Sequence, residues 1–157
     1  MAGLEPRGFK WVIAGKLAVS ERIGGYGFQH RRVRREEEIA WLSDQGIDGV
    51  LSLLPGNQNQ AAYESAGFRF YNRPIEEELG PEDTSSFFVV LDEALVRDRR
   101  SLLVHRDLID DQVVGLLGGY LVHAEFVRDP IVATSIIQEI VGRPIGPEGR
   151  KLIPLSR

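Results

Sequence analysis

Side chains that could do chemistry are concentrated in one short stretch of the sequence, HRDLIDDQ at positions 105–112. It contains an imidazole at His105, a guanidinium at Arg106 and carboxylates at Asp107, Asp110 and Asp111. An aspartate can act as a nucleophile toward a phosphoryl group, and carboxylates together with a histidine can bind a hard metal cation. The spacing matches no recognised metal-binding motif, so the flanking sequence must decide what this stretch does.

The letters His-Arg-Asp-Leu at 105–108 are also those of a protein-kinase catalytic loop. A kinase needs a nucleotide-binding lobe before this loop and an Asp-Phe-Gly after it. The chain has only 157 residues, its glycine-rich stretch RIGGYGF at 22–28 lacks the G-x-G-x-x-G spacing, and no Asp-Phe-Gly follows. We therefore reject the kinase interpretation.

The elements that must position this stretch alternate between strands and helices. Strands are predicted at 9–20 (one bent strand or two short ones), 49–54, 68–75 and 101–105. Helices are predicted over 34–47, 59–68, 81–98, 110–127, 129–142 and 146–153. This alternation predicts an α/β fold with a central, mainly parallel sheet flanked by helices. Ligands bind such a sheet at the carboxyl ends of its strands, which is where the loop 105–112 leaves the strand 101–105.

Length and composition indicate an ordinary globular protein. We expect one domain, 1–157, because a chain of this size can bury a sufficient core. The net charge of −4 argues against a nucleic-acid or anionic-membrane partner. No apolar run is long enough to span a bilayer, and the first residues do not form a signal peptide. We expect a soluble, cytoplasmic protein.

The chain contains no cysteine. Disulfides and thiolate metal sites are therefore excluded, and so is every mechanism that uses a cysteine nucleophile. The last exclusion decides how the following resemblance is interpreted.

Patterns along the chain resemble those of the small atypical dual-specificity phosphatases, which belong to the cysteine-based protein phosphatases. FKWVIAGKLAVS (9–20) is similar to their opening F-x-W-V-x-x-G-x-L-A-x-S, and WLSDQGIDGVLSL (41–53) to the helix-turn-strand that follows. RPIEEELGPED (73–83) occupies the place of their general-acid loop. LLVHRDLIDDQVVGLLGGYLV (102–122) parallels their phosphate loop, V-H-C-x-x-G-x-x-R-[ST]-G, and IIQEIVGRPIGPEG (136–149) their later A-I-x-x-I-R-x-x-R-P-G. The resemblance covers about 9–153 and implies the phosphatase fold.

The resemblance also implies a mechanism that this sequence lacks the groups to perform. In the family a cysteine thiolate attacks phosphorus, backbone N–H groups and an arginine hold the phosphate oxygens, and an aspartate protonates the leaving group. Aligned without a gap, the cysteine position is Arg106, the middle glycine is Ile109, the arginine is Gln112 and the next Ser/Thr is Val113. The general-acid position falls on Glu76, or with a small shift on Glu77 or Glu78. His105, which is structural in the family, is the one position that is unchanged.

We therefore predict a catalytically inactive pseudophosphatase that acts as a binding or regulatory module with a protein partner, without cofactor or metal. The alternative is a phosphatase or other hydrolase with an aspartate or metal-assisted mechanism. The former site is the loop His105, Arg106, Asp107, Leu108, Ile109, Asp110, Asp111 and Gln112. We expect Asp110 and Asp111 to lie at the N-cap and in the first turn of the following helix, and Arg106 to pair with these acids or with Glu76–Glu78. The oligomeric state is left open.

An arginine-rich stretch, QHRRVRREEE at 29–38, offers a second candidate surface. Its arginines could bind an acidic or phosphorylated partner. The spacing of arginines and glutamates equally predicts a solvated helix with ion pairs between successive turns, which is the interpretation we favour.

Overall fold

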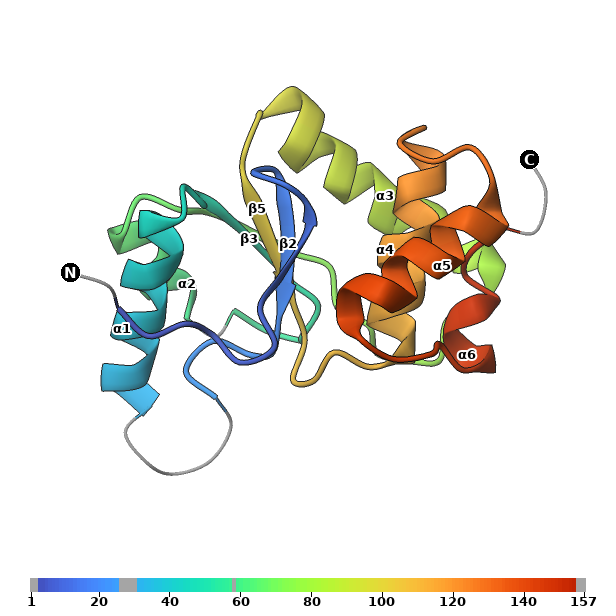
Figure 1. Cartoon of the computed structure of the whole chain (residues 1–157). Helices are drawn as coiled ribbons and strands as arrows, with labels where there is room; N and C mark the ends of the chain where they lie inside the picture. The colour runs from blue at the N-terminus through green and yellow to red at the C-terminus, as the bar shows by residue number, and fades with distance from the viewer. Residues whose placement is uncertain (1–2, 26–30, 58, 155–157) are drawn as a thin grey trace. The chain divides into compact units, whose positions relative to one another are not determined.

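The computed structural model describes residues 3–25, 31–57 and 59–154 (Figure 1). The chain divides into two compact units, the first formed by Met1–Glu76 and Asp92–Ile109, the second by Glu77–Leu91 and Asp110–Arg157. The loop 105–112 therefore begins in the first unit and ends in the second.

The first unit contains the whole described sheet. Its strands are β1 (Lys10–Ile13), β2 (Leu17–Ser20), β3 (Gly49–Ser52), β4 (Arg69–Asn72) and β5 (Leu102–His105). They lie in the order β1-β2-β5-β3-β4, and every neighbouring pair is parallel except β1 with β2. The predicted α/β class with a mainly parallel sheet is confirmed, and the segment 9–20 forms two short strands.

Helices α1 (Arg31–Asp44) and α2 (Gln60–Ser65) also belong to the first unit (Figure 1), as does a π-helical turn at Glu93–Arg97. Ile39 and Leu42 of α1 and Tyr63 of α2 pack in one core cluster with the sheet residues Val50 and Leu103. The alternate strand residues, which point to the other face of the sheet, are also buried: Leu17, Val19, Leu51, Leu102 and Val104. A sheet with apolar side chains on both faces is typical of α/β folds, in which both faces are covered.

The arginine-rich stretch lies partly in α1, and its first two residues, 29 and 30, are outside the described residues. Arg32 pairs with Glu36 at 3.2 Å and Arg34 with Glu38 at 3.1 Å, each one helical turn apart. Glu38 is fully buried and also accepts a hydrogen bond from the Gly24 backbone N–H at 2.6 Å. These described pairs follow the intrahelical pattern that the structural interpretation predicts.

The second unit is helical. It contains a 3₁₀ turn (Pro81–Asp83), most of α3 (Thr84–Asp92), α4 (Asp111–His123), α5 (Pro130–Val141) and α6 (Pro147–Arg150). The segment 81–98, predicted as one helix, is instead a 3₁₀ turn, an α-helix and a π-helical turn at Glu93–Arg97. None of the helices in the described ranges is long and apolar enough to cross a membrane.

Helix α4 is the central helix of the second unit and packs against α5 and α6. Its contact with α6 is backbone to backbone, because a Cβ at Gly115 would collide with the carbonyl group of Gly149. Such close packing leaves no room for a side chain at Gly115. It holds the first half of α4 directly against α6.

Candidate functional site

His105 ends β5 and lies in register with Ser20 of β2 and Ser52 of β3. All three polar side chains are buried at the carboxyl ends of their strands, and His105 is only 3% exposed. Among the described residues neither ring nitrogen of His105 has a hydrogen-bond partner of normal geometry. Burial lowers the pKa of His105 to about 4, against a smaller opposing effect of the Arg106 backbone. The imidazole is therefore neutral at pH 7 and enclosed, as expected of a structural histidine.

Arg106 stands where the resemblance places the nucleophile. Its Nη2 donates to the backbone carbonyl oxygen of Ile75 at 3.0 Å. Ile75 directly precedes Glu76, so Arg106 fixes the chain just before the acidic residues Glu76–Glu78. A guanidinium is permanently protonated and cannot attack phosphorus. The expected pairing of Arg106 with an acid stays a prediction.

The next three loop residues lie in the first unit and differ in exposure. Asp107 pairs with Arg22 at 3.4 Å while its side chain stays 53% exposed. Leu108 is half exposed. The Ile109 side chain lies against Gly8, where an added Cβ would come within 2.9 Å of its Cδ1. A branched side chain thus fills space at the position where the resemblance places a glycine.

The two aspartates at the start of α4 lie at the predicted N-cap and first-turn positions. Asp110 is the N-cap, and its Oδ1 accepts a hydrogen bond from the Val113 N–H at 3.0 Å. Asp111, in the first turn, accepts from Arg143 Nη1 through Oδ1 and from the Gly146 N–H through Oδ2, both at 3.0 Å. One carboxylate therefore caps the helix, and the other ties its first turn to the segment before α6.

Gln112 stands where the resemblance places the phosphate-binding arginine. Its side-chain Oε1 accepts a short hydrogen bond, 2.6 Å, from the backbone N–H of Leu79. The adjoining Glu78 pairs with Lys151 at 2.8 Å, and the Gly80 N–H donates to Asp83 at 2.8 Å. Within the second unit, three polar contacts thus hold the segment 78–80.

The acidic residues Glu76, Glu77 and Glu78 are all exposed. Which of them takes the general-acid position stays a prediction, although the Glu78 carboxylate is engaged by Lys151. Among the described residues, no three His, Asp or Glu side chains come close enough to form a metal-binding group.

Sequence reasoning missed the partners of the polar loop residues. Arg143 lies 32 positions after Asp111, and Leu79 lies 33 positions before Gln112. No local spacing rule joins residues so far apart, so only the packing of α4 against its neighbours reveals these contacts.

No protein-family model and no curated protein matches the sequence. Solved structures do match. Kinase associated phosphatase, with serine substituted for its catalytic-site cysteine, matches with a TM-score of 0.72 and 13% identity, over 94% of this chain and 92% of that chain. The chain has the fold of the dual-specificity and tyrosine phosphatases.

Further solved structures agree on this fold. The core catalytic domain of the PP-IP phosphatase SIW14 from S. cerevisiae, in complex with citrate, matches with a TM-score of 0.70 and 13% identity, over 99% of this chain and 88% of that chain. A variant of human DUSP28 matches with a TM-score of 0.62 and 15% identity, over 94% of this chain and 90% of that chain. Likeness at these identities establishes the fold, and activity must be judged from the residues themselves.

Proposed function

We propose that this chain is a catalytically inactive protein with a phosphatase fold that acts as a binding or regulatory module. The observation that carries the proposal is the absence of cysteine from all 157 positions. The chemistry associated with this fold begins with attack by a thiolate, and no residue elsewhere in the chain can supply one. At the equivalent position Arg106 offers a cation bound to a backbone carbonyl.

The polar contacts at the start of α4 support the same conclusion. The N-terminus of a helix binds phosphate when its N–H groups and positive dipole end are open. Here Asp110 accepts from one of those N–H groups and places a carboxylate at the helix end. Gln112 directs its oxygen to Leu79 and has no positive charge to clamp an anion. A phosphate at this position would meet a negative charge and lack the arginine that normally binds it.

Turnover of para-nitrophenyl phosphate, with and without Mg²⁺ and at several pH values, tests the proposal. We expect the rate of the wild-type chain to equal that of a Glu76→Gln, Asp107→Asn, Asp110→Asn background. A wild-type rate above this background would overturn the proposal. In parallel, phosphate or vanadate should leave the melting temperature unchanged, because the helix end is already occupied by Asp110.

A restored variant serves as a control for the assignment of the loop. Arg106→Cys, Ile109→Gly and Gln112→Arg together return the thiolate, the space and the guanidinium. Vanadate-sensitive turnover by this triple variant would show that the assay can detect activity in this fold. Capture of a host protein by the wild-type chain, followed by mapping of the contact with cross-links, tests the binding role.

The alternative function is an aspartate-dependent hydrolase, and one observation favours it. The Asp107 carboxylate is half exposed and lies beside Arg22. The Arg22 guanidinium could bind a phosphoryl oxygen next to this carboxylate. If this were the mechanism, Mg²⁺-dependent turnover would be lost in Asp107→Asn and retained in Glu77→Gln.

A further inference from the structure

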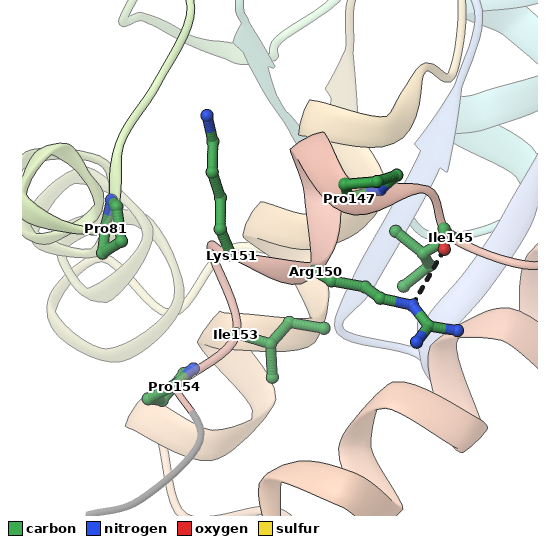
Figure 2. A pocket seen from close by; sticks show the side chains of 7 residues that line it. All are labelled: Pro81, Ile145, Pro147, Arg150, Lys151, Ile153 and Pro154. Carbon is green, nitrogen blue, oxygen red and sulfur yellow. Dashed lines mark hydrogen bonds between the residues drawn. The ribbon is translucent and has the colours of Figure 1, made fainter.

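The second unit has an open hollow of about 720 Å³ beside α6 (Figure 2). Its walls are mainly apolar and include three prolines, Pro81, Pro147 and Pro154, with Ile153 between them. Pro81 begins the turn that leads into α3, whereas Pro154 follows α6. Proline walls are rigid and donate no backbone hydrogen bond, so a ligand meets a preformed apolar surface.

Two smaller hollows share lining residues with the large one. One, of about 280 Å³, is bounded by Pro130 and Thr134 of α5, and the other, of about 470 Å³, by Phe88 of α3 and Val122 of α4. All three hollows share Pro154. We call these three adjoining hollows the proline groove.

Of the described residues that line the large hollow, Arg150 is the one cation with open donors. Lys151 is already paired with Glu78 at 2.8 Å and with Glu148 at 2.9 Å. Arg150 donates from Nε to the Ile145 carbonyl oxygen at 3.0 Å, as Figure 2 shows. Among the described residues, the two terminal nitrogens of its exposed guanidinium have no acceptor. A guanidinium oriented through Nε presents the fork that binds a carboxylate with two parallel hydrogen bonds.

Arg150 borders both the large hollow and the hollow beside α5. A ligand that satisfies this arrangement needs apolar groups on both sides of one acidic group. An extended peptide provides this, because its side chains are presented at regular intervals of about 7 Å on each face. Small molecules are bound in sites that enclose most of their surface, whereas here three open hollows adjoin at Pro154.

We propose that the proline groove binds an extended segment of a partner protein in which apolar side chains flank an aspartate or glutamate. The inference rests on the proposed function as a binding module, for which it identifies the docking surface and the chemistry of the partner. The carboxylate binds the Arg150 fork, and the apolar side chains enter the hollows that meet at Pro154.

The test uses the full chain and a display library of short random linear peptides. Peptides selected on the wild-type chain, with counter-selection on Arg150→Glu, are synthesised, and their affinities are measured by fluorescence anisotropy. We expect enrichment of an acidic residue between apolar residues. Arg150→Glu should weaken binding about tenfold or more, because a charge-assisted hydrogen bond to the peptide is lost. Arg150→Lys should weaken binding less. Pro154→Asp should also weaken binding.

Arg128→Glu is the matched control, because Arg128 is an exposed arginine of the same unit that lines none of the three hollows. It should leave peptide affinity unchanged.

The groove proposal is overturned if no peptide is enriched, if the enriched peptides are basic, or if Arg150→Glu and Arg128→Glu have equal effects. Peptide binding that appears only after deletion of residues 155–157 would mean that the groove is a site for these residues of the chain itself. That result would also overturn the groove proposal. Dodecanoate binding with the same Arg150 dependence, in the absence of peptide binding, would assign it to a small amphipathic anion.

The outcomes for the groove and for the proposed function are separable. Peptide or protein binding that is indifferent to Arg150 and Pro154 would refute the groove and leave the binding role intact. Aryl-phosphate turnover above the inactive background would refute the proposed inactivity, whatever the groove binds.

Discussion

Acidification should destabilise the protein through His105 in a narrow and predictable pH range. The imidazole is buried and unpaired among the described residues, so its charged form is disfavoured in the folded state. Its pKa is lowered from the ordinary value of 6.5 to about 4. Above pH 6.5 the ring is neutral in both folded and unfolded chains and contributes no pH dependence.

The magnitude follows from the two pKa values. Between pH 6.5 and pH 4 the unfolded chain binds a proton that the folded chain does not, so the free energy of unfolding falls as pH falls. At about 1.4 kcal/mol per pH unit, the complete loss from 6.5 to about 4 is about 3 kcal/mol. This is a large part of the 5–15 kcal/mol, roughly, by which domains are usually stable.

Urea denaturation at a series of pH values, for the wild type and His105→Asn, isolates this effect from that of the carboxylates. The difference in unfolding free energy between the two proteins should shrink by about 3 kcal/mol as pH falls from 7 to below 4. His123→Asn, which removes an exposed imidazole from the second unit, controls for the loss of a histidine from the unfolded chain. A difference that is constant with pH would refute the reasoning, because it would mean that the His105 ring takes up its proton equally well in the folded state.

Three further predictions concern α4 and its contacts, and urea denaturation measures each. Asp110→Ala should cost about 1 kcal/mol because the cap to Val113 is lost, whereas Asp110→Ser should cost less. Gln112→Leu should cost about 1–3 kcal/mol because the Leu79 N–H loses its partner, and an equal stability of the variant would show that water replaces this bond. Gly115→Ala should be more damaging than either, because its Cβ would collide with the Gly149 backbone; a variant as stable as the wild type would contradict this close packing.

Local patterns predicted those features that depend on a few neighbouring residues. The order of strands and helices followed from hydrophobic periodicity. The helix predicted over 129–142 is α5, whose N-cap Asp129 accepts from the Ile131 N–H at 2.8 Å. The cap formed by Asp110 was predicted for the same reason, since a cap involves only the next turn of its helix.

Features that depend on distant segments were not predictable in this way. The segment 81–98 has the apolar spacing of a single helix, yet it changes from 3₁₀ to α to π geometry along its length. The tie from Asp111 to Arg143 and Gly146 joins α4 to the segment before α6. The proline groove combines residues from Pro81 to Pro154, which no window of sequence brings together.

The sequence by itself determined that this chain has no cysteine and therefore no thiolate, and its resemblance to the phosphatases predicted an α/β fold in which arginine and glutamine stand at the positions of the nucleophile and the phosphate clamp. Those conclusions need only residue identity and order. The tertiary structure decided where these two side chains are directed, Arg106 to Ile75 and Gln112 to Leu79. It also decided that Arg150 borders an apolar groove. Hydrogen bonds across 31 or 33 positions depend on how helices and strands pack in space, and packing is a property of the whole fold.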